Sequence, residues 1–263
     1  MFALATDYSE TTPFQRRPPI FASPKLNGVR AMWLAREKLL ISRDKKVFRR
    51  DILAELYAAL DEVPINLDGE LYLHGTPLPA IAGAVNIHRD APSDLSRKME
   101  FHVFDLPADS RIAILRFESL LKFTPPAPNI KVVPHVKLTD VTALDTIYDS
   151  YVRAGYEGAV YKHALALYHP RRTPYLIKRK AWKDVEVKVV GLKKGEGVTN
   201  SNTIGALLCR MPSGAEFSVT LTEIAERDWW SSNPLLDAPL IKVRYLELTA
   251  DGIPHQPIYE GRV

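Results

Sequence analysis

The stretch Ser23–Arg30, SPKLNGVR, contains a lysine whose neighbours could hold it in a fixed position. Lys25 follows a proline, which restricts the backbone, and a glycine stands three residues further on. A positioned lysine acts as a nucleophile when its amine is neutral, whereas a lysine in a loop is more often a solvated charge. The stretch alone does not distinguish these two interpretations.

Five short clusters place charge inside or at the end of an apolar strand. A buried charge is costly there unless it has a function. They are Lys25–Arg30, Ser42-Arg43, Asp68–Tyr72, Glu157–Lys162 and Leu176–Lys180, with Phe101–Leu106 (FHVFDL) between the third and the fourth. Each has an ordinary structural explanation by itself. DGE is usually a turn, and alternating Lys-Arg-Lys is usually the solvated face of an edge strand.

Several common site types are absent from the sequence. It has no GxxxxGK[ST] loop, no GxGxxG fingerprint and no GxSxG turn, and its seven histidines are not spaced as metal ligands. The single Cys209 excludes an intrachain disulfide and a cysteine-based zinc site. Any phosphate chemistry must therefore rest on side chains at separate points along the chain.

In this order, the clusters resemble the signature of the covalent nucleotidyltransferases, most closely the small ATP-dependent DNA ligases of phage type. The resemblance covers nearly the whole chain: KxxGxR, SR, DGE, an aromatic strand ending in Phe-Asp, EGxxxK and KxK, then TADGIPHQPIY, which is similar to the end of the ligase barrel domain. It implies that AMP passes from ATP to a lysine and then to a 5′-phosphate at a nick, after which a 3′-hydroxyl closes the break.

The resemblance implies three catalytic lysines. Lys25 matches the nucleophile, and Lys178 and Lys180 match a lysine pair near the α-phosphate of ATP. The charges of this pair would favour loss of the Lys25 proton and stabilise negative charge on the phosphorus oxygens.

The resemblance also implies a set of nucleotide ligands. Arg30 and Arg43 resemble arginines that hold the ribose or the nick phosphate, a role suited to the bidentate guanidinium. Glu70 would accept hydrogen bonds from the ribose, and Phe104 would stack on adenine. Lys162 is a further candidate phosphate contact, although Phe104 and Lys162 fit a core aromatic and a surface charge equally well.

Glu157 and Asn27 are the candidate metal ligands, and Mg²⁺ is the expected ion, with Mn²⁺ able to substitute. Asn27 stands where the family usually has Asp. Its amide oxygen can coordinate a metal but brings no negative charge, so we expect an enzyme that is slower or needs more metal. The last family motif, an Arg followed by an acidic residue and a Lys, orients the pyrophosphate, and here only Arg262 corresponds to it.

The resemblance and the short N-terminal stretch together lead us to expect ATP as the cofactor. Only 24 residues precede Lys25, too few for the module with which NAD-dependent ligases recognise nicotinamide mononucleotide. The expected partner is nicked duplex DNA, held by two core domains of a monomer without a separate DNA-binding domain. The loop Lys193–Gly205 is the best candidate DNA contact, and a plain hairpin connection is the alternative.

The elements that must position these residues divide near Lys183. Helical periodicity predicts helices within 49–64 and 139–155, and apolar runs predict strands within 65–73, 99–106 and 158–162. The proline-rich segment 124–134 reads as a connection. Residues 184–263 contain about five strand-like runs separated by turn residues, which is typical of a small barrel or sandwich.

With the resemblance, these patterns predict an α+β protein of two domains. Residues 1–183 would form an adenylyltransferase domain, the ATP-grasp-like catalytic domain of DNA ligases, made of antiparallel sheets and helices. Residues 184–263 would form an all-β OB-fold barrel.

Charge is distributed unevenly along the chain. Residues 1–183 carry 27 Lys and Arg against 20 Asp and Glu, a net charge of +7, and residues 184–263 carry 8 against 11, a net charge of −3. A basic first domain suits a polyanion, although solubility alone explains it as well. The N-terminus does not resemble a signal peptide and there is no long apolar run, so we expect a protein of the bacterial or phage-infected cytoplasm without a membrane association.

Three other functions remain open. An RNA ligase uses the same adenylated lysine, and Asn27 is less unusual there, but the DNA-ligase-like ending argues against it. A capping guanylyltransferase is disfavoured by the same ending and by the short chain. A nucleic-acid-binding homologue without catalysis fits Asn27. It would leave one set of charged residues without a function: Lys25, Glu70, Glu157, Lys178 and Lys180.

Overall fold

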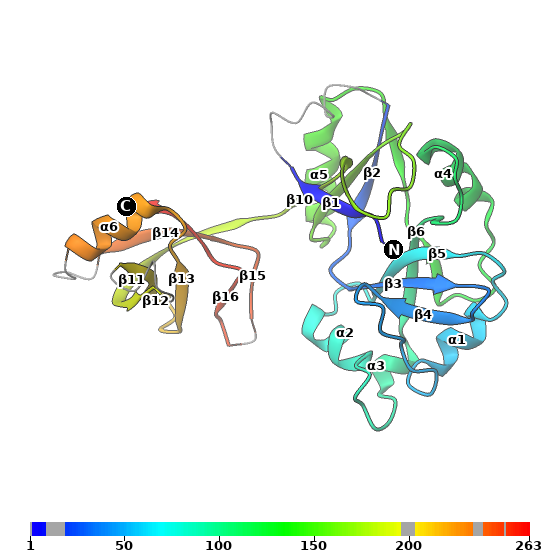
Figure 1. Ribbon diagram of the computed structural model, residues 1–263, viewed down its shortest axis with the longest axis horizontal. Helices are drawn as coiled ribbons and strands as arrows, with labels where there is room; N and C mark the ends of the chain where they lie inside the picture. The colour runs from blue at the N-terminus through cyan, green and yellow to red at the C-terminus, as the bar shows by residue number, and fades with distance from the viewer. Residues whose placement is uncertain (1, 9–18, 196–202, 234–238, 250) are drawn as a thin grey trace. The chain divides into compact units, whose positions relative to one another are not determined.

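The computed structural model describes residues 2–8, 19–195, 203–233, 239–249 and 251–263 (Figure 1). The chain forms two compact units, Met1–Lys180 and Ala181–Val263. The first unit contains two five-stranded sheets, and the second contains one five-stranded sheet and a two-stranded ribbon. No helix in the described ranges is long and apolar enough to cross a membrane.

The first sheet positions most of the lysines. Its order is β1-β10-β9-β2-β8, with bounds β1 Leu4–Asp7, β10 Arg172–Lys180, β9 Gly158–His163, β2 Ile20–Lys25 and β8 Val136–Leu138. Side chains alternate across the sheet, so that Ala22, Tyr161 and Ile177 pack beneath helix α5 (Ala143–Arg153). The residues between them, including Val160 and Lys178, line a cavity on the opposite face.

The second sheet supplies the arginine and carboxylate residues. Its order is β4-β3-β5-β6-β7, with bounds β4 Leu39–Ser42, β3 Val29–Leu34, β5 Leu67–Tyr72, β6 Glu100–Asp105 and β7 Ile130–Val132. One face is apolar and packs Trp33, Leu71 and Phe101 into the main core. The helices of this half are α1 Ala54–Leu60, α2 Leu78–Ala84, α3 Asp94–Arg97 and α4 Ala113–Lys122.

A register shift in the second sheet brings two consecutive residues to the cavity. Asp68 pairs with Asp105, whereas Gly69 already pairs with Val103, so β6 carries an extra residue at this point. A bulge of this kind breaks the two-residue alternation of a strand. Phe104 and Asp105 therefore both line the cavity, although they are neighbours in sequence.

The second unit is built on an antiparallel sheet of order β13-β12-β11-β14-β17. Its strands are β11 Lys183–Lys194, β12 Ile204–Arg210, β13 Glu216–Thr220, β14 Leu240–Tyr245 and β17 Ile258–Arg262, and β15 Glu247–Leu248 pairs with β16 Pro254–His255. Helix α6 (Ile224–Ser232) inserts Trp230 into the core of this unit.

The α+β prediction is confirmed, as is the antiparallel, OB-like character of the C-terminal sheet. Three details differ. The segment 124–134 is not only a connection, because it contributes β7, which pairs parallel to β6. The sheets are not wholly antiparallel, because β1 also pairs parallel to β10. Helix α6 was not predicted, because its EIAERDWW sequence shows only a weak apolar face.

Candidate active site

A cavity of about 300 Å³ lies within the first unit and is lined by both of its sheets. Eight of the ten residues proposed from the sequence line it: Lys25, Arg30, Arg43, Glu70, Phe104, Lys162, Lys178 and Lys180. Although these residues span 156 positions of sequence, the alternation of the strands brings them to one place. Asn27 and Glu157 do not line the cavity. Glu157 forms an ion pair with Lys25, and Asn27 follows Lys25 by two positions in the sequence.

Lys25 ends β2 and forms an ion pair with Glu157. The backbone fixes this partner, because the Glu157 amide donates to the Lys25 carbonyl at 3.1 Å. Lys180 Nζ lies 3.8 Å from the other carboxylate oxygen of Glu157. Burial lowers the pKa of Lys180, against the opposing charge of Glu157. Glu157 thus stands between two lysines at the edge of the cavity.

Close packing of the backbone explains why a glycine, Gly158, follows Glu157. Its φ is +148°, and a Cβ at this position would lie 2.0 Å from the Arg179 carbonyl oxygen. Gly158 pairs with Lys25 on β2 and with Lys180 on β10. The absence of a side chain therefore lets three strands approach closely enough to bring both lysines to Glu157.

Arg30 is held by Asp68 and by the rings of Phe2 and Phe104. Its Nε and Nη2 donate to the two Asp68 oxygens at 2.8 and 2.7 Å, and its guanidinium carbon lies 4.5 Å from the centre of the Phe104 ring. Despite burial, the Asp68 charge keeps the pKa of Arg30 above its usual value. Arg30 also stands directly opposite Glu70 across β3 and β5.

Glu70 is the candidate carboxylate whose acidity is most clearly weakened by its surroundings. Burial raises the pKa of Glu70 from 4.5 to about 7, against the opposing charges of Arg30 and Lys25. Near neutral pH its carboxyl is therefore about half protonated. In that state it offers both a donor and acceptors to the hydroxyls of a bound sugar.

Arg43 projects from a tight turn shaped by Ser42. The Ser42 hydroxyl accepts from the Lys46 amide at 3.1 Å, and the Ser42 amide donates to the Lys46 carbonyl at 2.8 Å. Lys45 has a φ of 62°, a left-handed conformation that is uncommon outside glycine and asparagine. The turn places Arg43 at the mouth of the cavity beside two further exposed lysines.

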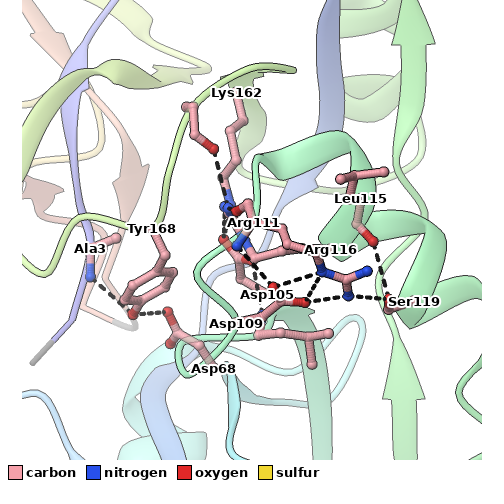
Figure 2. A network of polar contacts seen from close by, with 12 residues as sticks. Ala3, Asp68, Asp105, Asp109, Arg111, Leu115, Arg116, Ser119, Lys162 and Tyr168 are labelled. Atoms are coloured by element: carbon pink, nitrogen blue, oxygen red, sulfur yellow. Dashed lines mark hydrogen bonds and ion pairs between the residues drawn. The ribbon is translucent and has the colours of Figure 1, made fainter.

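Lys162 is not a surface charge, because its side chain is largely buried. It forms an ion pair with the buried Asp105, which also accepts from Arg116 Nε at 2.7 Å (Figure 2). Although burial opposes ionisation, Lys162 and Arg116 hold the pKa of Asp105 well below its usual value. Burial also lowers the pKa of Lys162, against the pull of Asp105. These ion pairs of Asp105 with Lys162 and Arg116 join β6 to β9 and to α4.

Sequence comparison identifies the family of this site. A model described as "ATP dependent DNA ligase domain" matches residues 1–180, which hold all ten candidate residues. The chain belongs to this ligase family. Its fold also agrees, because a solved structure from a study of Lig E DNA ligases superposes with a TM-score of 0.81 and 25% identity, covering 100% of this chain and 98% of that one.

Two curated ligases are also similar in sequence. The DNA ligase of African swine fever virus (isolate Pig/Kenya/KEN-50/1950) is 30% identical over 279 residues, covering 94% of this chain and 62% of the viral protein. The DNA ligase of Haemophilus influenzae is 27% identical over 244 residues, covering 90% of this chain and 84% of that protein. This ligase-family chain therefore spans less than two thirds of the length of its viral relative.

Several residues around the cavity were missed as functional candidates. Asp68 and Asp105 stood inside motifs that were singled out, and their position within apolar strands was the available signal. Arg116, Tyr168 and His135 gave no such signal, because nothing near them in sequence marks them. His135 lines the cavity and stacks on Phe117, with ring centres 3.9 Å apart, and burial lowers its pKa to about 3.

The two C-terminal predictions have different outcomes. Arg262 forms an ion pair with Glu226 at 2.8 Å and stacks over Trp229 at 4.0 Å, both within the second unit. Its predicted role toward pyrophosphate remains a prediction. The centre of the Lys193–Gly205 loop, residues 196–202, lies outside the described residues.

Proposed function

We propose that this chain is an ATP-dependent DNA ligase that seals nicks in duplex DNA through AMP bound covalently to Lys25. The observation that carries the proposal is the lysine at the edge of a cation-rich cavity, paired with Glu157 and flanked by Lys180. A cavity of about 300 Å³ suits a nucleotide, and small-molecule sites are commonly of this size.

In the first step, the Lys25 amine attacks the α-phosphorus of ATP. A P–N bond forms, the bond to the β-phosphate oxygen breaks, and pyrophosphate leaves. The amine must lose a proton to solvent before it attacks, and the charges of Lys178 and Lys180 in the same cavity would favour that loss. Lys178 and Lys180 would stabilise the negative charge that develops on the phosphorus oxygens.

In the later steps, a 5′-phosphate oxygen attacks the same phosphorus and releases Lys25. A 3′-hydroxyl then attacks the activated 5′-phosphate, and AMP leaves as the phosphodiester forms. Arg30 and Arg43, which both line the cavity, would hold the sugar and the phosphates during these exchanges. Glu70 and Phe104 would contact the ribose and the adenine, and Lys162 a phosphate.

We propose that Glu157 and Asn27 hold a magnesium ion. The described residues contain no group of three His, Cys, Asp or Glu side chains that could enclose a metal. Magnesium fits this donor set, because it commonly binds one or two protein oxygens and takes its other ligands from water and phosphate. When bound, the ion would neutralise charge on the phosphate oxygens.

A panel of substrates tests the proposal. The protein is incubated with ATP and Mg²⁺ and then offered a nicked DNA duplex, a nicked RNA duplex or single-stranded RNA. We expect sealing of the DNA nick, and a gel that shows sealing of RNA alone would replace DNA ligase with RNA ligase. A parallel sedimentation run on the protein with nicked DNA tests the expected one-to-one complex of a monomer.

A further inference from the structure

At the wall of the cavity, four residues from four separate segments form a closed ring of hydrogen bonds. Asp68 on β5 accepts from Arg30 on β3 and from the Tyr168 hydroxyl at 2.7 Å. That hydroxyl accepts from the Ala3 amide at 3.2 Å, and the Ala3 carbonyl accepts from Arg30 Nη2 at 3.3 Å. Figure 2 shows the part of the ring formed by Ala3, Tyr168 and Asp68.

The Tyr168 hydroxyl uses its donor and an acceptor position at the same time. Because it donates to Asp68 and accepts from Ala3, its direction is fixed. Burial, and then the charge of Asp68, raise the pKa of Tyr168, so the donor proton stays on the hydroxyl. From the Ala3 amide through the Tyr168 hydroxyl to Asp68, each bond polarises the next, which strengthens the hold on the carboxylate.

Ala3, Arg30 and Asp68 line the cavity. Asp68 Oδ2 accepts from both Tyr168 and Arg30, so fixing the carboxylate also fixes the guanidinium. Arg30 then stays between Phe104, at 4.5 Å, and Phe2, at 5.5 Å. Tyr168 itself does not line the cavity. Any influence it has on a bound nucleotide must therefore pass through another residue.

We propose that Tyr168 is a positioning residue for nucleotide binding, which acts through Asp68 to hold Arg30 in its binding orientation. The proposal rests on the proposed function, because the nucleotide is taken to be ATP. Without the hydroxyl, Asp68 keeps, among the described residues, only its hydrogen bonds to Arg30, and the Ala3 carbonyl alone then ties the pair to the rest of the ring, so the pair is held less firmly. Reordering it on binding would cost affinity without changing the chemistry at Lys25.

The test is Tyr168→Phe, with Tyr175→Phe on β10 as the matched control, since Tyr175 is 49% exposed. Each variant is assayed for AMP transfer to the enzyme over a range of ATP concentrations, and the active fraction is measured from the burst of labelled protein. We expect the KM for ATP of Tyr168→Phe to rise about tenfold, with the maximum rate per active enzyme within about twofold of the parent. The control should match the parent.

If Tyr168 had a purely structural role, the variant would change in other properties. It would lower the active fraction and the melting temperature while leaving the KM for ATP unchanged, and that result would overturn the proposal. If the parent protein forms no labelled intermediate at all, the proposed function fails instead. The two failures are therefore distinguishable.

A second measurement tests the route through Arg30. Tyr168→Phe is also made in the Arg30→Lys background, where the bidentate pair with Asp68 is already lost. We expect the effect of Tyr168→Phe on the KM for ATP to shrink to less than about twofold in that background. A full tenfold effect would show that Tyr168 acts by another route and would contradict the proposal.

Discussion

At the scale of single residues, Glu70 combines a carboxyl group with surroundings that resist its ionisation. Its pKa in the folded protein is about 7, against 4.5 for an exposed glutamate. Between these two pH values the folded state binds more protons than the unfolded state. The contribution of Glu70 to the free energy of unfolding is therefore largest at acid pH and falls as the pH rises through this window.

Glu70→Gln should remove this fall, because the amide resembles the protonated acid. We expect the variant without ATP to gain on the order of 1 kcal/mol in unfolding free energy relative to the parent at pH 8, and almost nothing at pH 4.5. Urea unfolding at several pH values measures this, with the exposed Glu62→Gln as control. An equal difference at both pH values would contradict the assigned pKa.

Asn27 is the residue whose type departs from the expected pattern. A carboxylate beside Lys25 would bring a negative charge that an amide lacks, so Asn27→Asp should bind a divalent cation more tightly. We expect the Mg²⁺ concentration for half-maximal sealing to fall severalfold in a titration of the variant. An unchanged requirement would show that the missing charge does not matter.

At the scale of elements, close strand approach at Gly158 sets the distance between the lysines. Gly158→Ala must move the Arg179 carbonyl and adopt a strained φ, and we expect a loss of about 2 kcal/mol or more together with loss of AMP transfer. Gly83 in helix α2 is the control, because nothing lies within 4 Å of its added Cβ. Gly83→Ala should be neutral or stabilising in thermal unfolding. Equal stability of the two variants would contradict this role for Gly158.

The sequence predicted the elements whose signals are local. Helix α5 lies within 139–155, as the helical periodicity predicts, and Gly155, with a φ of +86°, follows its end. The bulge at Phe104 and the parallel strand β7 were missed because each depends on partners far away in sequence. Tyr168 was missed for the same reason, since its role exists only where Asp68 and Ala3 meet.

At the scale of the whole molecule, the positive charge lies in the part that holds the candidate site. Residues 1–183 have a net charge of +7, and Lys45 and Lys46 are exposed on the turn beside Arg43. If this face contacts DNA, binding must release counterions from the phosphates.

Affinity for nicked DNA should therefore fall steeply with salt. We expect a plot of log affinity against log salt concentration to have a negative slope, reduced by about 2 in a Lys45→Ala/Lys46→Ala double variant. Fluorescence anisotropy at several salt concentrations gives this slope. An identical slope for parent and double variant would show that the turn does not contact DNA.

The central claim is that Lys25 carries AMP, and mass spectrometry of the protein after incubation with ATP and Mg²⁺ tests it most directly. We predict that AMP is found on the peptide containing Lys25, that Lys25→Ala carries none, and that the control Lys122→Ala at the end of α4 is modified as the parent is. Parent protein without AMP, or AMP on Lys25→Ala at the parental level, would contradict the account.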